Sequence, residues 1–289
     1  RIFATPLIPN VHISCPGASD GTIDIYVPSG STAPYDFRLV KNDTITIDSG
    51  TFTGNYDPLN PDTYRRYYKM LGAGTYKLIV RDNNYCEVIK TTELEEPERI
   101  TAQYEVSDYN GYSVSCRNYN NGFIRISSVT GGSGSYQFGW SNEAGPVQAD
   151  PSGMLLESAG AGDYYITISD AILDCSVTDT ITLTEPDGMD LESFVLSASE
   201  DGNFNISCSG GNDGSIALTI SGGSGMKSYS WDGPGGFTSD SKDISGLAAG
   251  TYIVTVTDIN GCTLLLPDTH EKPEFVLIEP AILDFTYNL

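Results

Sequence analysis

The sequence predicts an all-β protein of three tandem immunoglobulin-like antiparallel β-sandwich domains in an extended array. One segment occurs three times in altered form, and its first glycine is Gly74, Gly162 or Gly250, so the copies are 88 residues apart. The copies contain short runs rich in β-branched and aromatic residues, with apolar residues at alternate positions. Apolar residues do not recur at helical spacing over a helix-length window. Short strands at this density in about ninety residues are typical of an immunoglobulin-like sandwich.

Each repeat presents the same landmarks in the same order. An early cysteine precedes a turn, a β run, a glycine-rich link and an aromatic run, and a late cysteine follows a tyrosine-containing strand. A Glu-Pro pair then closes the repeat. The landmarks are the early cysteines Cys15, Cys116 and Cys208, the aromatic residues Phe37, Trp140 and Trp231, the late cysteines Cys86, Cys175 and Cys262, and the pairs Glu96-Pro97, Glu185-Pro186 and Glu279-Pro280.

The two tryptophans lie at a nearly constant distance from the early cysteine, as does the core tryptophan of a sandwich strand. We therefore expect the indoles of Trp140 and Trp231 to be buried. The alternative is that they serve as platforms on which sugar rings stack.

The landmarks divide the chain into domains at 1–97, 98–186 and 187–280, and residues 281–289 restart the apolar alternation of a further repeat. The first domain carries an insertion at about 48–69. Only a few residues separate one domain from the next, so we expect a monomeric rod of domains that lie end to end.

Six cysteines allow 15 pairings, and we predict one disulfide in each repeat because three like domains can share that pattern. The predicted pairs are Cys15–Cys86, Cys116–Cys175 and Cys208–Cys262. A zinc site is the alternative, but it would need closely spaced ligand pairs, and the sequence has no CxxC. Disulfides place the protein outside the cytoplasm.

The net charge of −23 argues against two classes of partner. An acidic surface repels nucleic acid and anionic lipid, so we predict neither as a partner. No run of eighteen apolar residues occurs, so we predict no membrane insertion.

The third repeat resembles the SprB-type repeat, and the resemblance extends, more weakly, to the other two. The residues that carry it are Ile206-Ser207-Cys208-Ser209-Gly210-Gly211-Asn212-Asp213-Gly214-Ser215-Ile216, Ser228-Tyr229-Ser230-Trp231, Leu247-Ala248-Ala249-Gly250-Thr251-Tyr252 and Ile259-Asn260-Gly261-Cys262-Thr263. The resemblance implies a very large cell-surface adhesin of gliding Bacteroidetes. It also implies type IX secretion, an outer-membrane-associated location, and contact with the gliding machinery through other parts of the parent protein.

We therefore predict a non-enzymatic adhesin segment that serves as stalk and contact surface in adhesion and gliding motility. Two alternatives stay open: a carbohydrate-binding accessory region of a secreted polysaccharide-degrading enzyme, and a structural spacer of another surface protein. The only histidines, His12 and His270, lie in different end repeats, so we predict no histidine-based catalytic or metal site.

An aspartate ends the tyrosine-containing strand of every repeat, at Asp82, Asp170 and Asp258. We expect each carboxylate to accept backbone N–H groups of the following turn. The alternative is a Ca²⁺ ligand at a domain junction, and Ca²⁺ is the one cofactor that we consider.

The insertion of the first repeat offers a basic, aromatic surface in an otherwise acidic protein. Alignment of Leu71 with the other repeats places Tyr68 in the core, so alternation turns Arg65, Tyr67 and Lys69 outward. Aromatic faces and cations suit an acidic extracellular polysaccharide, and a solid surface is the other partner that we consider. The alternative is an edge strand whose charges block further sheet pairing.

Overall fold

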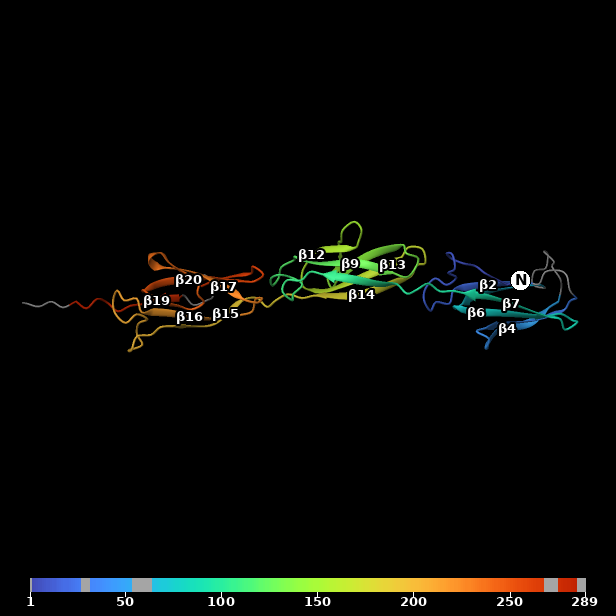
Figure 1. The fold of residues 1–289 in the computed structure, drawn as a ribbon, viewed down its shortest axis with the longest axis horizontal. Coiled ribbons are helices and arrows are strands. Elements are labelled where there is room, and N and C mark those ends of the chain that lie inside the picture. The colour runs from blue at the N-terminus through green and yellow to red at the C-terminus, as the bar shows by residue number, and fades with distance from the viewer. Residues whose placement is uncertain (1, 27–31, 54–63, 268–274, 285–289) are drawn as a thin grey trace, which may run out of the picture. The chain divides into compact units, whose positions relative to one another are not determined.

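The computed structural model describes residues 2–26, 32–53, 64–267 and 275–284 (Figure 1). Within these residues the regular structure is β, apart from one short 3-10 turn, η2, at Pro234–Gly236. This confirms the predicted all-β class. None of the described residues forms a helix that is long and apolar enough to cross a membrane.

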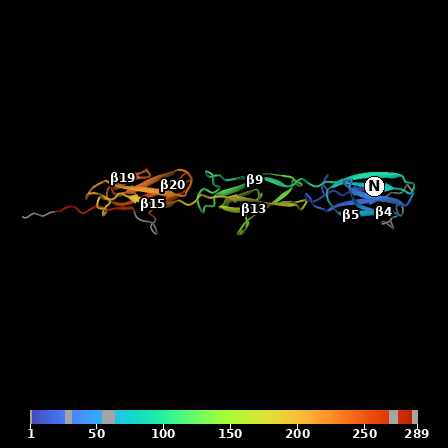
Figure 2. The same ribbon diagram turned by 90° about the horizontal axis from the view of Figure 1, so that it is seen from below.

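The strands of residues 2–94 form two antiparallel sheets. One sheet has the order β1-β2-β5, and its strands are β1 Ile2–Ala4, β2 Gly21–Tyr26 and β5 Arg65–Leu71. The other has the order β4-β3-β6-β7, and its strands are β3 Tyr35–Lys41, β4 Ile45–Phe52, β6 Gly74–Arg81 and β7 Glu87–Leu94. Strands β4 and β5 lie close together in Figure 2. The hydroxyl of Tyr68 in β5 donates to the carboxylate of Asp48 in β4 at 2.7 Å.

The strands of residues 101–183 repeat this plan. One sheet has the order β12-β9-β8, with β8 Thr101–Val106, β9 Gly122–Thr130 and β12 Leu155–Ala159. The other has the order β11-β10-β13-β14, with β10 Tyr136–Asn142, β11 Gly145–Val147, β13 Gly162–Asp170 and β14 Ser176–Leu183.

The strands of residues 190–277 repeat it again. One sheet has the order β15-β16-β19, with β15 Asp190–Leu196, β16 Gly214–Ser221 and β19 Ile244–Leu247. The other has the order β18-β17-β20-β21, and β22 also pairs with β20; its strands are β17 Lys227–Gly233, β18 Phe237–Ser239, β20 Gly250–Asp258, β21 Thr263–Leu266 and β22 Phe275–Leu277. Figure 1 shows β17 and β20 in one layer and β15 and β16 in the other.

By its contacts the chain forms two compact units, each assembled from separate stretches. The first comprises residues 1–104, 126–154 and 165–180, and the second comprises residues 105–125, 155–164 and 181–289. The domain boundaries at 97 and 186 stay predictions.

Alternation along the strands builds the core. In β20 the side chains of Tyr252, Val254 and Val256 are buried, and their neighbours along the strand are more exposed. Trp231 is only 1% exposed and Trp140 only 5%, which confirms the predicted burial of both indoles. Each indole N–H also has an acceptor, as buried polar groups require.

The glycine that follows the turn after each early cysteine packs against backbone. A Cβ atom on Gly214 would lie 2.9 Å from the carbonyl oxygen of Leu247 and 2.7 Å from the side chain of Ile206. Gly21 and Gly122 meet the carbonyl oxygens of Leu71 and Ala159 in the same way. Because no Cβ fits there, packing of the strand pair requires the glycine of the Asp-Gly and Asn-Gly motifs.

Candidate functional site

The cysteines are paired differently from our prediction. Cys15 is bonded to Cys175 and Cys116 to Cys262, with Cα separations of 5.5 and 5.7 Å, inside the range that disulfides adopt. Cys86 and Cys208 are free and exposed. The predicted pairs Cys15–Cys86, Cys116–Cys175 and Cys208–Cys262 are therefore wrong.

The length of β7 explains why a bond within the first repeat fails. Cys86 directly precedes this eight-residue strand. The loop of Cys15 contacts the far end, where the Glu96 carboxylate accepts the N–H of Gly17 at 2.6 Å. Eight extended residues span roughly 26 Å, several times the Cα separation of a disulfide. The two cysteines of one repeat therefore lie at opposite ends of a strand.

The two bonds follow one rule: each joins the early cysteine of one repeat to the late cysteine of the next. Hydrogen bonds surround the Cys116–Cys262 bond. The side-chain amide of Asn260 donates to the carbonyl oxygens of Tyr109 and Ser115, at 3.1 Å each, and its Oδ1 accepts from Asn110. This junction therefore combines a covalent bond with a directional polar contact.

The aspartates that end the tyrosine-containing strands hold the turns that carry the late cysteines. In the third repeat the Oδ1 of Asp258 accepts the N–H groups of Asn260 and Cys262, both at 2.9 Å. The Oδ1 of Asp82 accepts the N–H groups of Asn84 and Cys86 at the same distance. In the second repeat the Oδ1 of Asp170 accepts the N–H groups of Ile172 and Leu173. The predicted role of these carboxylates is confirmed.

Asp170 has a second set of donors from the glycine-rich link. Its Oδ2 accepts the N–H of Ser133 at 2.5 Å, and its Oδ1 accepts the Ser133 hydroxyl at 2.7 Å. Burial alone would raise the pKa of Asp170, but hydrogen bonds from Ser133, Leu173 and Ile172 outweigh burial and lower this pKa. In the part of the chain that the structure describes, no group of three or more His, Cys, Asp or Glu residues could hold a metal ion.

The basic edge strand has the orientation that the sequence predicts. Strand β5 lies at one edge of its sheet, and Arg65, Tyr67 and Lys69 are exposed. The Arg65 guanidinium forms an ion pair with Asp24 of β2, in which Nε donates to Oδ1 at 2.8 Å. That hydrogen bond and the charge of Asp24 raise the pKa of Arg65. The ammonium of Lys69 lies 5.5 Å from the centre of the Tyr67 ring.

Tyr68 faces the core, but it is half-buried rather than enclosed. It pairs with Ile23, as Ile244 pairs with Ile216 in the third repeat, so the predicted alignment is correct. Its hydroxyl donates to the Oδ2 of Asp48 at 2.7 Å. Burial and this hydrogen bond raise the pKa of Tyr68.

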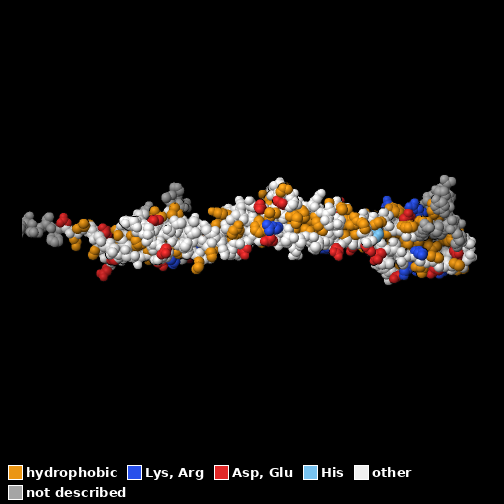
Figure 3. Space-filling model, turned by 45° about the horizontal axis from the view of Figure 1, so that its top comes forward, with side chains coloured by type: hydrophobic (Ala, Val, Ile, Leu, Met, Phe, Trp, Pro, Cys, Tyr) orange, Lys and Arg blue, Asp and Glu red, His pale blue; other side chains and the backbone are white. Residues whose placement is uncertain are grey.

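Basic side chains are concentrated in the first repeat, since nine of the chain's 15 lysines and arginines fall in residues 1–97. Figure 3 shows blue atoms gathered mainly over this part of the molecule. The repeats that follow carry three lysines and arginines each and are more acidic.

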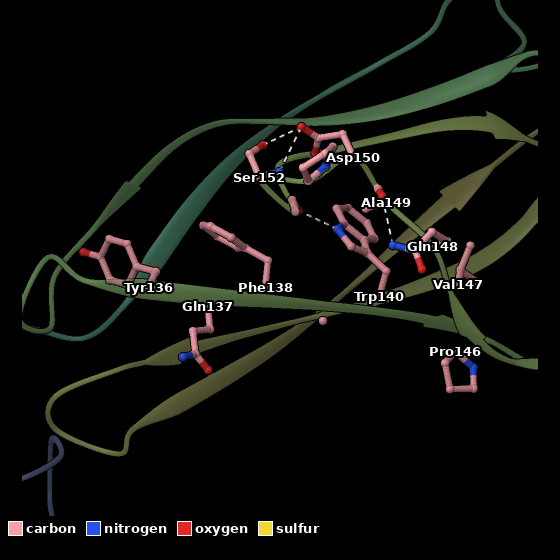
Figure 4. Close-up of a pocket in the computed structure, with 13 residues that line it drawn as sticks. Tyr136, Gln137, Phe138, Trp140, Pro146, Val147, Gln148, Ala149, Asp150 and Ser152 are labelled. Carbon is pink, nitrogen blue, oxygen red and sulfur yellow. Dashed lines mark hydrogen bonds between the residues drawn. The ribbon is translucent and has the colours of Figure 1, made fainter.

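An open hollow of about 570 Å³ lies beside β10. Phe138 and Trp140 point from β10 toward the segment 148–153, as Figure 4 shows. The indole N–H of Trp140 donates to the carbonyl oxygen of Gly153 at 2.7 Å, while Asp150 accepts from the Ser152 hydroxyl. Because the indole is buried, its face is not free to stack on a sugar ring.

The family model of the SprB repeat matches residues 11–44, 113–145 and 205–236. No curated protein matches the sequence.

Solved structures of low similarity include three N-terminal domains of the outer capsid protein Hoc of bacteriophage RB49, at 12% identity, with a TM-score of 0.38 over 92% of this chain and 94% of that one. Another is a structure concerned with host cell surface retention of a 1.5-MDa bacterial ice-binding adhesin, at 12% identity, with a TM-score of 0.39 over 92% of this chain and 95% of that one.

Proposed function

We propose that this chain, which carries three SprB repeats, is a non-enzymatic segment of a large secreted cell-surface adhesin. The observation that carries the proposal is the match of all three repeats to one repeat family. The disulfides support an extracellular site, because such bonds persist in oxidising compartments. The finer proposal is that the adhesin is exported by type IX secretion and serves gliding motility, and it rests on the SprB resemblance alone.

The location and the motility role can be tested on intact cells of the organism that makes the chain. Antibodies against residues 1–289 should label unpermeabilised cells, and beads coated with them should travel along the surface of gliding cells. An antibody against a cytoplasmic protein is the control. Label that appears only after permeabilisation would contradict surface display, whereas bound but stationary beads would contradict only the motility role.

We also propose that the exposed face of β5 contacts acidic extracellular polysaccharide. Lys69 and the half-exposed ring of Tyr67 supply a cation and an aromatic face, whereas Arg65 is already paired with Asp24. The contact should therefore depend more on Lys69 and Tyr67 than on Arg65. Because the attraction is partly ionic, it should weaken as salt is raised.

The measurement is the affinity of the chain for an acidic polysaccharide such as alginate. The triple substitution Arg65→Ala, Tyr67→Ala, Lys69→Ala should lower affinity by about tenfold, which corresponds to about 1.4 kcal/mol. The double substitution Lys77→Ala, Lys90→Ala removes the same number of positive charges elsewhere in the repeat and serves as the control. Equal losses of affinity in both variants would mean that binding depends on net charge and not on the face of β5. An absence of binding by the unaltered chain would refute the proposed contact.

A further inference from the structure

We propose that Cys86 and Cys208 are the two halves of further disulfides between repeats. Cys86 would bond the early cysteine of another SprB-type repeat, and Cys208 the late cysteine of one. A second copy of this chain offers both partners, so two copies can be joined head to tail through Cys208 and Cys86. The inference does not depend on adhesion or motility.

The equivalents of the two free cysteines are all bonded. Cys86 is the late cysteine of its repeat, and the late cysteines Cys175 and Cys262 are each bonded to the early cysteine of the preceding repeat. Cys208 is an early cysteine, and its equivalents Cys15 and Cys116 are each bonded to a late one. The two free thiols are therefore the positions at which the same rule has no partner within residues 1–289.

The turn of Cys86 is built like the bonded turn of Cys262. In both, an aspartate four residues before the cysteine accepts its N–H and that of the asparagine two residues before it, all at 2.9 Å. In the bonded turn, the asparagine Asn260 donates to two carbonyl oxygens of the partner loop. Its equivalent, Asn84, is exposed beside the free Cys86. The turn of Cys86 therefore has a thiol and a side-chain amide in the places that Cys262 and Asn260 occupy beside the Cys116–Cys262 bond.

The loop of Cys208 is built like the bonded loop of Cys116. The Ser197 hydroxyl donates to the carbonyl oxygen of Asn205, as Ser107 donates to Ser113. Asp213 accepts the N–H of Ser207, as Asn121 accepts that of Ser115. The Glu279 carboxylate accepts the N–H of Gly210, as Glu185 accepts that of Asn118.

The likeness between the loops of Cys116 and Cys208 identifies the carbonyl groups that would accept the Asn84 amide. Tyr109 and Ser115 supply the carbonyl oxygens that receive Asn260. Their counterparts beside Cys208 are Ser199, which closes its hairpin onto Phe204, and Ser207. These carbonyl groups are the ones that would receive the amide of Asn84 from a second copy.

Bond formation removes two protons and two electrons from the thiols of Cys86 and Cys208. Glutathione disulfide accepts both and yields two molecules of reduced glutathione, through a mixed disulfide that the second thiolate attacks. A bond between two copies of Cys86 would leave both Asn84 amides without the early-cysteine loop that receives Asn260, and a bond between two copies of Cys208 would leave both such loops without an amide. The geometry therefore favours the mixed pair over either like pair.

The test uses two variants with one free thiol each. Cys208→Ser retains Cys86, and Cys86→Ser retains Cys208. Both are equilibrated alone and as a mixture in a buffer of reduced and oxidised glutathione, and dimers are separated on non-reducing gels. In the mixture we expect the Cys86–Cys208 dimer to exceed each like dimer by about tenfold. Random pairing alone gives a twofold excess, so the remaining factor of about five corresponds to about 1 kcal/mol of preference. Statistical yields of the three dimers, or no dimer, would overturn the proposal.

Two controls separate recognition from thiol reactivity. Asn84→Ala in the chain that retains Cys86 should reduce the excess of the mixed dimer severalfold, although the thiol is unchanged. A chain with Cys86→Ser, Cys208→Ser and Val195→Cys carries its thiol at an exposed strand position outside the loop. It should bond Cys86 no better than like pairs do. Peptide mapping must also find Cys15–Cys175 and Cys116–Cys262 intact, and a mixed dimer that arises only by their exchange would refute the proposal.

Discussion

At the residue scale, one carboxylate joins strand, turn and link in the second repeat. Asp170 is only 3% exposed, and it accepts backbone N–H groups from the turn on one side and from Ser133 on the other. A buried anion with this many donors is stabilised in its charged form. The same carboxylate thereby orients the turn that leads to Cys175.

Asp170→Ala should lower the free energy of unfolding by about 1–3 kcal/mol, because it leaves buried N–H groups without an acceptor. Urea denaturation at pH 7 measures this difference. Asp187→Ala, at an exposed aspartate, is the control and should change stability by less than about 0.5 kcal/mol. Equal stability of the Asp170 variant and the unaltered chain would mean that water replaces the carboxylate at no cost.

The stabilisation by Asp170 should also depend on pH. Its pKa in the folded state lies below the unfolded value of about 3.9, so the stabilisation is complete above that value. It is lost as the pH falls through the folded-state pKa. The stability difference between the unaltered chain and Asp170→Ala should therefore shrink at strongly acidic pH, as urea titrations at several pH values would measure. A difference that stays constant down to pH 2 would contradict a lowered pKa.

At the element scale, β5 separates a structural face from an exposed one. Its inward side chains pack on the core between β2 and β4, and Tyr68 adds a hydrogen bond to Asp48. Its outward side chains carry the charge that an edge strand needs to avoid pairing with another sheet. Edge protection and the proposed contact with polysaccharide are therefore compatible uses of the same residues.

Tyr68→Phe should cost about 0.5–1.5 kcal/mol of folding stability, because it removes one hydrogen bond and keeps the ring. Tyr68→Ala should cost about 2–3 kcal/mol, below the usual range of about 3–5 kcal/mol for truncation of a buried aromatic residue, because the side chain is half-buried. Tyr67→Ala, one residue away and exposed, should cost less than about 0.5 kcal/mol. Thermal or urea denaturation of the three variants measures the order, and a larger loss for Tyr67→Ala would mean that the orientation of β5 is wrong.

At the scale of the whole molecule, the two disulfides connect successive repeats and their sequence loops overlap. The bonds span 160 and 146 residues, and residues 116–175 lie inside both loops. Loop-closure entropy gives each bond at most about 5 kcal/mol, and the overlap makes the two contributions non-additive. A polypeptide cross-linked in this way stays connected after a single cut within either loop.

A backbone cut between Pro97 and Glu98 should leave the two pieces joined by Cys15–Cys175. A protease site inserted there, followed by cleavage, should give one band on a non-reducing gel and two bands after reduction. The same experiment on Cys15→Ser should give two bands in both gels. Two bands from the cleaved, otherwise unaltered chain without reductant would contradict the Cys15–Cys175 bond and would favour disulfides within repeats.

Thiol counting tests the same connectivity independently. The native chain should present two reactive thiols, Cys86 and Cys208, and six after reduction and unfolding. Reduction should also lower the melting temperature, because the unfolded chain gains the entropy that the cross-links remove. A monomeric native chain without reactive thiols would contradict the finding that Cys86 and Cys208 are free.

Much of the fold could be predicted from local pattern. Alternation predicted the strands, the distance from the early cysteine predicted the buried Trp140 and Trp231, and turn chemistry predicted the role of Asp82, Asp170 and Asp258. Each of these properties depends on neighbours that are close in sequence or on a periodicity that the strand itself imposes. The outward orientation of Arg65, Tyr67 and Lys69 followed for the same reason.

The cysteine partners could not be predicted in this way, because spacing along the chain does not say which ends of strands meet. Cys15 and Cys86 belong to one repeat, yet the length of β7 holds them apart, while the turn of the next repeat brings Cys175 to Cys15. The ion pair between Arg65 and Asp24 likewise depends on the register of β5 against β2. Contacts of this kind arise when separate elements are brought together, and their free energy is available only in the folded chain.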